Sequence, residues 1–496
     1  MTAVALAAYA VLLAVAAIAV WRRPLVALYL WIVGVALHNS VGAALYGAGV
    51  RGSALTAIQA WKEILLAVAL LRVGSDALRA RALPFRPRLV DGFALAYAVL
   101  VCVYAVIPQH VLGGAADAHA VGLALKHDLV PVAAYFLGRA VIVRREQLVP
   151  VAWTLIGAAA IVAAWGLIDD YAISIAWWRN SAVVPYFHKH LGYDYHGTGG
   201  LPENFIYNTG SEQHFLRRLV SVFLSPLATA YMLTVALLLS AALWRRARVP
   251  ATLSIVIAAG LLFTFSRSSL IALAAGLVVL AIVARMRWPL AAAAVTIGVF
   301  VGWAHVFTHV APQGHWTKQD LRLQRQISQR NPGATGNPVS TREPSIREHL
   351  TSLRDGARTV VHHPQGYGLG NAGQTASRTA TPIKAGESNY TEMGAEMGIL
   401  GSVLWTAWIV VLLVALVRAA RLTRWWAAVA ISAAFAAAAV LAIQTDVIGD
   451  PWMGYVLWML AGIAVAPPAL RADDEPAVDV VAERPVRRVP VVGVDR

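Results

Sequence analysis

The sequence predicts an all-α polytopic membrane protein, a prediction that rests on its composition, its apolar runs and the placement of its arginines. Of the 496 residues, 58% are hydrophobic and 14% are charged, and the mean hydropathy is +0.62. Soluble globular domains are far less apolar, so a soluble enzyme is excluded. Strands of alternating polar and apolar residues are not evident, so the apolar runs are expected to be helices.

Apolar runs of about 20 residues, the length that crosses a bilayer as a helix, recur along the chain. We expect 12–13 transmembrane helices from thirteen such runs. The first run is followed by Arg22 and Arg23 without an A-x-A cleavage site, so we expect a retained helix and not a signal peptide. The runs cover approximately residues 2–21, 25–44, 54–71, 89–107, 127–143, 149–168, 219–243, 250–265, 269–284, 289–308, 395–417, 426–444 and 452–468.

Arginines gather in alternate connections between these runs, and their placement predicts the orientation of the chain. Seventeen of them fall on one side, in the connections that follow the runs ending near residues 21, 71, 143, 243, 284 and 417. Short cytoplasmic loops are enriched in Lys and Arg, so this side is predicted to be cytoplasmic. The N-terminus is then external and the C-terminus internal. The net charge of +15 is assigned to these loops, and no nucleic-acid partner is expected.

These assignments divide the chain into six segments. The long loop over 309–394 holds ten Lys/Arg against six Asp/Glu and therefore suits an anionic ligand, and the apolar spacing of Glu343 to Val361 predicts a helix within it. The segments are N-terminal transmembrane helices over 1–168, an external loop over 169–218, central transmembrane helices over 219–308, the long external loop over 309–394, C-terminal transmembrane helices over 395–468 and a disordered cytoplasmic tail over 469–496.

Cofactor and metal motifs are not recognisable in the sequence. The single cysteine, Cys102, lies inside an apolar run, so neither a disulfide within the chain nor a cysteine-based metal site is possible. Nucleotide-binding loops, the zinc-peptidase motif and the nucleophile elbow are not found in a convincing context. We therefore expect no cofactor and no metal.

Four short segments, taken together, resemble a known family. In chain order they are Arg218–Pro226 (RLVSVFLSP), Phe265–Ser269 (FSRSS), His363–Asn371 (HPQGYGLGN) and Glu387–Gly401 (ESNYTEMGAEMGILG). They resemble motifs of bacterial O-antigen ligases and O-antigen polymerases and cover roughly residues 215 to 405. The long loop before the last helices agrees with that family's organisation.

The resemblance implies a fold like that of C-type glycosyltransferases and an enzyme of the bacterial inner membrane. Such an enzyme moves a glycan from a polyprenyl-diphosphate-linked donor to a hydroxyl of a glycan or lipid-linked acceptor. The reaction takes place at the periplasmic or external face, inverts the anomeric carbon and uses no metal. Besides these two substrates, membrane lipids are the expected partners, and the loop over 309–394 is the expected catalytic loop.

Arg267 and Arg218 are the first candidates for catalysis. A diphosphate leaving group needs cations, and arginine offers two fixed donors to a phosphate. Both residues stand at predicted external helix ends, where an arginine facing lipid is costly, so they are expected to line a polar cavity. The alternative is that they reach phospholipid headgroups. Arg217, Arg347 and Arg354 are expected to bind substrate, with the same alternative.

Glu387 is the third catalytic candidate, because the family has a histidine at the head of the final motif. A carboxylate can also accept or orient the proton of an acceptor hydroxyl. The replacement of the family histidine by glutamate favours a polymerase, or another wall-glycan transferase, over a lipopolysaccharide ligase. His362 and His363 are alternative bases, or structural residues of a turn. The remaining candidates for substrate binding are Asn389, Tyr390 and His363.

Several charged residues fall inside or beside the apolar runs. Lys62 and Arg139 are expected to pair with Glu63 or Asp128, although a role in the path of the carrier lipid is the alternative. In the last external loop, Asp446 and Asp450 either touch the acceptor sugar or solvate a turn.

Three other functions are compatible with many membrane helices. A secondary transporter is disfavoured because no internal repeat or pair of broken helices is evident. A peptidoglycan polymerase of the shape-elongation-division type is disfavoured because its loop chemistry depends on an aspartate motif that has no match here. A non-catalytic flippase or scaffold is the third alternative.

Overall fold

The computed structural model of the protein describes residues 2–193, 200–202, 204–209, 211, 213–244, 250–330, 337–340, 342–384 and 388–465. Within these residues helices dominate, and the only sheet has three short strands in the order β1-β2-β3. The prediction of an all-α polytopic membrane protein is confirmed.

The N-terminal part of the chain forms seven α-helices and two 3-10 turns. Helices α3 and α4 form one apolar pair that is bent by 42°. The elements are α1 (Thr2–Arg22), α2 (Val26–Gly47), α3 (Gly52–Gln59), α4 (Trp61–Ala80), α5 (Leu89–Val106), η1 (Gln109–Leu112), α6 (Ala118–Ala140), η2 (Arg145–Gln147) and α7 (Leu148–Ala172).

The first long loop and the central helices follow. The loop contains α8 (Ile175–Asn180), α9 (Val183–Pro185), η3 (Tyr186–His190), β1 (Ile206–Tyr207), β2 (His214–Arg217) and η5 (Ser221–Phe223). The central helices are α10 (Pro226–Leu243), α11 (Ala251–Phe263), α12 (Arg267–Ala284) and α13 (Trp288–Val310).

The second long loop leads into the C-terminal helices. It contains β3 (Gln313–His315), α14 (Lys318–Arg330), α15 (Pro344–His362) and α16 (Gly373–Arg378), and α15 matches the helix predicted from Glu343 to Val361. The chain ends its described part with α17 (Asn389–Thr423), α18 (Trp426–Leu441), η6 (Met453–Leu457) and α19 (Trp458–Ala464).

The described helices that are long and apolar enough to span a membrane are fewer than the 12–13 expected. All thirteen apolar runs coincide with helices, but nine described helices are long and apolar enough to cross a membrane, or ten with the α3–α4 pair. The runs at α11, at α18 and over Met453–Ala464 form shorter apolar helices. Helix α18 has 16 residues, fewer than the about 20 that cross a bilayer core as a helix, and almost all of them are buried against other parts of the protein.

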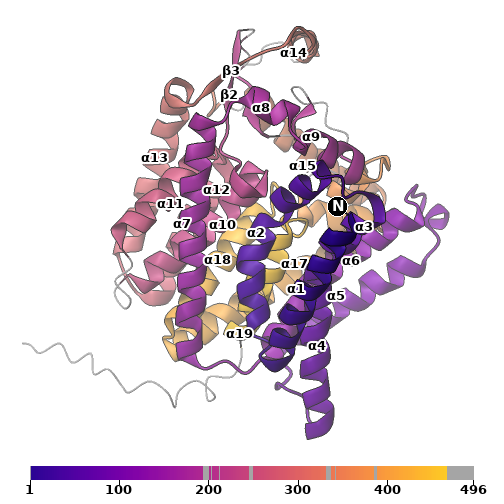
Figure 1. The fold of residues 1–496 in the computed structure, drawn as a ribbon. Helices are drawn as coiled ribbons and strands as arrows, with labels where there is room; N and C mark the ends of the chain where they lie inside the picture. The colour runs from indigo at the N-terminus through magenta and orange to yellow at the C-terminus, as the bar shows by residue number, and fades with distance from the viewer. Residues whose placement is uncertain are drawn as a thin grey trace, which may run out of the picture.

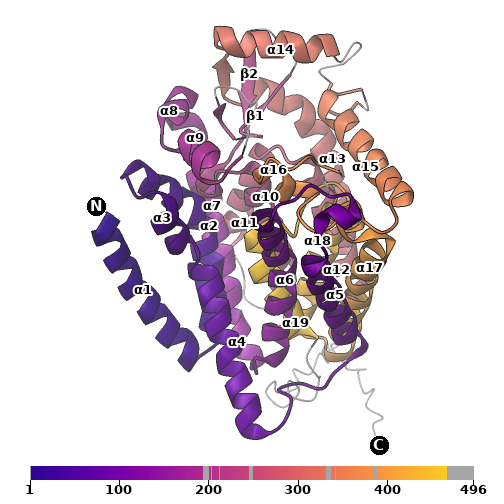
Figure 2. The ribbon, with the colours of Figure 1, turned by 90° about the vertical axis from the view of Figure 1, so that its right-hand side faces the viewer.

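Both long loops lie at the same end of the helix bundle. Figures 1 and 2 show α8, α9, β2, α14 and α15 together at the top, above the long helices. Strand β2 joins the loops directly, because it pairs with β1 of the first loop and with β3 of the second. The two loops therefore form one continuous cap on the bundle.

Close helix crossings hold the bundle together. Gly138 of α6 and Gly462 of α19 face each other's helix, and a Cβ at either position would overlap a backbone oxygen, of Met459 or Tyr135 respectively. Small residues allow such close approach between membrane helices. Helices α6 and α19 thus form a tight pair below the capping loops.

A buried ion pair joins α5 to α6. Arg139 Nε lies 2.9 Å from Asp91 Oδ1 and Arg139 Nη2 lies 3.1 Å from Asp91 Oδ2, and Tyr135 Oη donates to Asp91 Oδ1 at 2.6 Å. The expected partner of Arg139 was Glu63 or Asp128, and this expectation is wrong because the first turn of α5 packs against the last turn of α6. The predicted pair of Lys62 with Glu63 is confirmed at 3.4 Å.

We expect loss of one partner of the α5–α6 ion pair to be far more harmful than loss of both. Asp91→Leu leaves the Arg139 guanidinium buried without a counter-charge and should lower the free energy of unfolding by about 3–5 kcal/mol. The double variant Asp91→Leu/Arg139→Met removes both charges and should recover most of that loss. Thermal melting in detergent measures both, and an Asp91→Leu protein that melts like wild type would refute the structural role.

Candidate functional site

The sharp turn between α11 and α12 positions the first candidate arginine. Phe265 adopts a left-handed backbone with φ 48°, and Ser266 Oγ lies 2.7 Å from Ser269 Oγ. The turn makes Arg267 the first residue of α12. Its side chain therefore starts at the end of the bundle that carries the capping loops.

Contacts from both capping loops hold the Arg267 guanidinium. Arg267 Nη1 donates to Pro338 O at 2.7 Å and to Glu343 Oε2 at 3.1 Å. The guanidinium carbon lies 5.8 Å from the centre of the Tyr207 ring. The side chain stays 16% exposed, so an anion can reach a guanidinium that is already oriented.

Arg218 lies next to this group and has no described carboxylate partner. Its Nε donates to Thr264 O at 2.9 Å and its Nη1 to Asn204 Oδ1 at 3.2 Å. Burial, together with the positive charge of Arg267, lowers the pKa of the Arg218 guanidinium to about 9. The group is still charged at neutral pH. Arg218 and Arg267, which we call the arginine pair, thus have one described counter-charge between them, Glu343.

Arg217 is bound differently from its neighbour. It forms ion pairs of 2.9 Å with both Asp169 and Asp170 and also donates to Ile173 O. Successive side chains along an extended strand point to opposite faces, which separates Arg217 from Arg218. Two carboxylates neutralise Arg217, and it joins β2 to the end of α7.

The glycine-rich segment His363–Asn371 docks on a break in α17. Tyr367 N donates to Ala395 O at 2.7 Å, and Ile399 N donates to Pro364 O at 2.9 Å. The helix is interrupted at Met397 and Gly398, where Gly398 has φ 71°. Two segments that are separate in the sequence are therefore parts of one structural unit.

Asn371 and His363 fasten this unit to the connection between α5 and α6. The fully buried Asn371 accepts a hydrogen bond from Ala115 N at 2.7 Å and donates to Gln109 Oε1 at 2.8 Å. His363 Nε2 lies 2.8 Å from Leu112 O, and its ring stacks on Tyr367 with centroids 3.8 Å apart. These contacts of His363 are with other residues of the protein. They agree with the alternative in which His363 is a structural residue of a turn and not a base.

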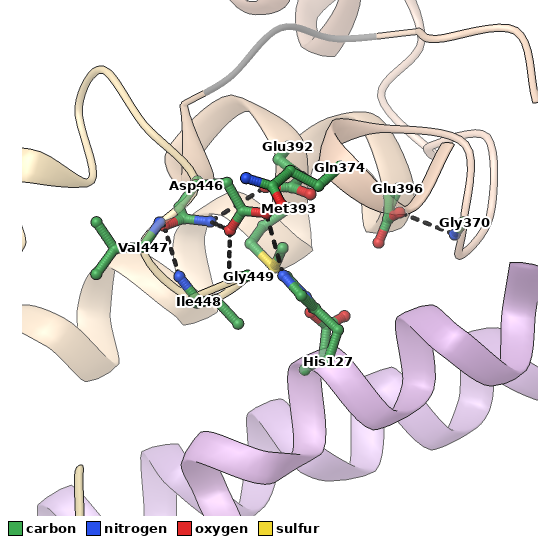
Figure 3. A network of polar contacts seen from close by, with 12 residues as sticks. His127, Gly370, Gln374, Glu392, Met393, Glu396, Asp446, Val447, Ile448 and Gly449 are labelled. Carbon is green, nitrogen blue, oxygen red and sulfur yellow. Dashed lines mark hydrogen bonds and ion pairs between the residues drawn. The ribbon is translucent and has the colours of Figure 1, made fainter. Parts of the chain in front are cut away.

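Glu392, in the first turn of α17, lies close to Asp446 (Figure 3). Asn389, the first residue of α17, organises this buried group of acids. Its Nδ2 donates to Asp446 Oδ1 at 2.8 Å and to Glu392 Oε2 at 3.1 Å, while its Oδ1 accepts from Val447 N at 2.7 Å. The next residue, Tyr390, donates to Ala439 O at 3.1 Å. Asn389 thus holds two carboxylates in place.

His127 of α6 completes the group. Its Nε2 lies 3.2 Å from Asp446 Oδ2 and its Nδ1 lies 2.9 Å from Asp128 Oδ1. Figure 3 shows His127 directed from α6 toward Asp446. We call His127, Asp128, Glu392 and Asp446 the acid–histidine cluster.

The acid–histidine cluster can hold protons or a cation. An imidazole with a carboxylate at each nitrogen is satisfied when both nitrogens carry protons. Among the described residues, His127, Glu392 and Asp446 are also the one group whose potential metal-ligand atoms lie within 4.8 Å of one another. The sequence did not indicate this group as a whole, because Asp446 was expected at the acceptor sugar or in a turn and Asp128 beside Lys62 or Arg139. The local signal for it was the His127–Asp128 pair inside an apolar run.

Tyr231 of α10 connects the two sites. Its hydroxyl donates to Thr445 Oγ1 at 3.0 Å, and Thr445 precedes Asp446. The same side chain is near enough to Arg218 to interact with its charge. Tyr231 therefore lies on the path from Arg218 to the segment that carries Asp446.

The remaining sequence candidates are separate from these sites or not described. Arg347 and Arg354 are exposed on α15 and make no described contact with the arginine pair. Glu387 lies outside the described residues. It directly precedes Ser388, which bonds to Ala442 O, and Asn389 of the acid group.

Comparison with known proteins finds a family match within the central and C-terminal parts of the chain. Residues 252–406 match a family model described as O-antigen ligase. No curated protein shows a significant match to the chain. The matching region runs from α11 into α17 and contains Arg267, the glycine-rich segment and the break at Gly398. The resemblance to the O-antigen ligase and polymerase superfamily is confirmed, and it supports a membrane glycosyltransferase of this type.

We expect Gly398→Ala to destabilise the protein, because a Cβ there would overlap Pro364 O and φ is 71°. The left-handed backbone alone should cost about 1–3 kcal/mol. Gly302→Ala in α13 is the matched control, since a Cβ there meets nothing, and it should be neutral or slightly stabilising. Melting in detergent compares the two, and equal melting temperatures would contradict the docked arrangement.

Proposed function

We propose that the protein transfers or polymerises glycan from a polyprenyl-diphosphate-linked donor onto an acceptor hydroxyl at the external membrane face. The observation that carries this proposal is the arginine pair, two guanidinium groups with one described counter-charge at the loop-covered end of a membrane bundle. The family match over residues 252–406, which includes Arg267, supports the same reaction class.

In this proposal the arginine pair binds the diphosphate of the donor. Negative charge grows on the leaving oxygen as the bond to the anomeric carbon breaks. Guanidinium donors that are already oriented stabilise this charge more in the transition state than in the ground state. Arginine charge then takes the part that a divalent cation plays in other diphosphate-cleaving enzymes, so the proposed reaction is metal-independent.

The acceptor hydroxyl attacks from the face opposite the leaving diphosphate, which inverts the anomeric carbon. The proposed acceptor of its proton is the carboxylate of Glu387, in the place of the family histidine. Asn389, two residues later, orders Asp446 and Glu392, and this supports a proton-handling region at the start of α17. In the proposal, Tyr390 and His363 shape the site around this region.

The three other candidate arginines are proposed to act around the donor diphosphate and the acceptor hydroxyl. Arg347 and Arg354 are exposed on α15, which suits contact with the glycan or with headgroups. Arg217 fixes β2 against α7 and so positions Arg218, to which it is joined in the chain.

We expect Arg267→Ala to lose most transfer activity, by roughly 10² or more, as when a preorganised donor is removed. Arg267→Lys keeps the positive charge but lacks the two fixed N–H donors of a guanidinium, so it should retain only part of the transfer activity. The measurement is single-turnover transfer from a short-chain polyprenyl diphosphate donor by purified protein in detergent, where no gradient can drive transport. Arg79→Ala, an exposed residue in the last turn of α4, is the control. Full activity in a well-folded Arg267→Ala would exclude the proposed role.

We expect the capping loops to face the outside of the cell. In a Cys102→Ser background, a cysteine in place of Leu350, which is 52% exposed on α15, should react with an impermeant thiol reagent in cells with a permeabilised outer membrane. A cysteine in place of Leu83, 69% exposed in the arginine-rich connection after α4, should react only after lysis. The reverse labelling pattern would place the site in the cytoplasm.

A further inference from the structure

A second cationic group lies where α4 meets α6. Lys62 Nζ and Lys126 Nζ lie 3.4 and 3.3 Å from the same atom, Glu63 Oε1. Arg378 of α16 is close enough to interact electrostatically with Lys62. Two ammonium groups therefore share one carboxylate. Arg378 joins them through the loop between them, because its Nε donates to Leu191 O at 3.4 Å and the preceding His190 bonds at 2.7 Å to Gln59, whose carbonyl accepts from Lys62. Lys62 is buried, whereas the Lys126 side chain is 47% exposed and open to a ligand.

The bend between α3 and α4 fixes Lys62. Its Nζ donates to Gln59 O at 3.0 Å, at the bend, and lies 3.3 Å from His38 Nε2. Broken helices at membrane depth occur where the chain lines a polar cavity, and charged residues there usually serve a ligand. A purely structural group would be balanced, as Arg139 and Asp91 are. This group retains an excess of positive charge.

A chain of contacts places this cationic group beside the acid–histidine cluster. The Arg378 guanidinium lies 5.5 Å from the centre of the Tyr193 ring, and Tyr193 Oη donates to Gln374 Oε1 at 3.3 Å. Figure 3 shows Gln374 beside Glu392. Tyr193 is also near enough to Asp446 to interact with its charge. The acid–histidine cluster therefore has a cationic group on each of two sides. Tyr231 lies between it and the arginine pair, and Tyr193 with Gln374 lies between it and Arg378.

We propose that Lys62, Lys126 and Arg378 form a second anion site, which binds the phosphate or diphosphate group of a lipid-linked acceptor. The inference rests on the proposed function, in which the arginine pair holds the donor. Ammonium and guanidinium groups both form charge-assisted hydrogen bonds to phosphate. Two substrates that are each anchored by a phosphate next to the same cluster would present the acceptor hydroxyl to the anomeric carbon in a fixed orientation.

Binding stoichiometry tests the second site without requiring transfer. The probe is a fluorescent short-chain polyprenyl diphosphate, titrated into the detergent-solubilised full chain. We expect two equivalents to bind to wild type. Lys126→Gln and Arg378→Gln should each weaken one of them by roughly 10- to 100-fold, as for a lost hydrogen bond to a charged group, and Lys126→Arg should retain both. Arg51→Gln, an exposed cation that contacts Tyr46, is the control and should also retain both.

Competition identifies the source of the phosphate. Polyprenyl phosphate should displace the probe from the site that Lys126→Gln removes. Equal displacement by phosphatidylglycerol micelles would mean a general headgroup site, and equal displacement by inorganic diphosphate would mean a site for free phosphate. Either result would overturn the assignment to a lipid-linked acceptor.

The arginine pair provides an independent reference. Arg267→Gln should abolish the other binding event and leave the one that depends on Lys126. If Lys126→Gln and Arg378→Gln bind two equivalents like wild type, or if wild type binds one, the second site is refuted while the donor site stands. If Arg267→Gln binds two equivalents and Lys126→Gln binds one, the proposed donor site is wrong and the second site stands.

Discussion

The cost of placing a charged side chain among apolar helices is the constraint on which the rest of this structure depends. Arg139 and Arg217 are buried against carboxylates, Asp91 in one case and Asp169 with Asp170 in the other. Buried charges of this kind need a partner, and here the partners join neighbouring elements of the fold. Arg218 is equally buried, yet its described partners are neutral oxygens. That contrast separates arginines that hold the fold from those available to an anion.

The docked glycine-rich segment explains how distant parts of the chain form one site. Backbone hydrogen bonds join Tyr367 to Ala395 and Ile399 to Pro364, across the break in α17. The contact between the two backbones leaves no room for a side chain at Gly398. The first turns of α17, before the break, carry Asn389, which orders the acids that lie close to His127 of α6. The same part of α17 therefore both docks the glycine-rich segment and carries the residues of the acid–histidine cluster.

The sequence predicted local features well and tertiary pairings poorly. The position of α13 follows from an apolar run and that of α15 from apolar periodicity, which are both local properties. FSRSS was predicted as the turn between two helices, and the structure makes Arg267 of this segment the first residue of α12. The partner of Arg139 could not be predicted, because it depends on how α5 packs on α6. His127 and Asp446 are 319 residues apart in the sequence, so their contact had no local signal. The apolar run over 426–444 predicted a full span, but the helix it forms, α18, has 16 residues, because hydropathy does not predict where a helix ends.

The central claim is that the arginine pair binds the donor diphosphate, and a structure with bound ligand tests it most directly. The measurement is cryo-electron microscopy of the full chain with a short-chain polyprenyl diphosphate. The account predicts diphosphate density within hydrogen-bonding distance of both Arg218 and Arg267, with Glu343 displaced from Arg267. Diphosphate density elsewhere, with Arg267 still bound to Pro338 O and Glu343 and Arg218 still bound to Thr264 O, would contradict it.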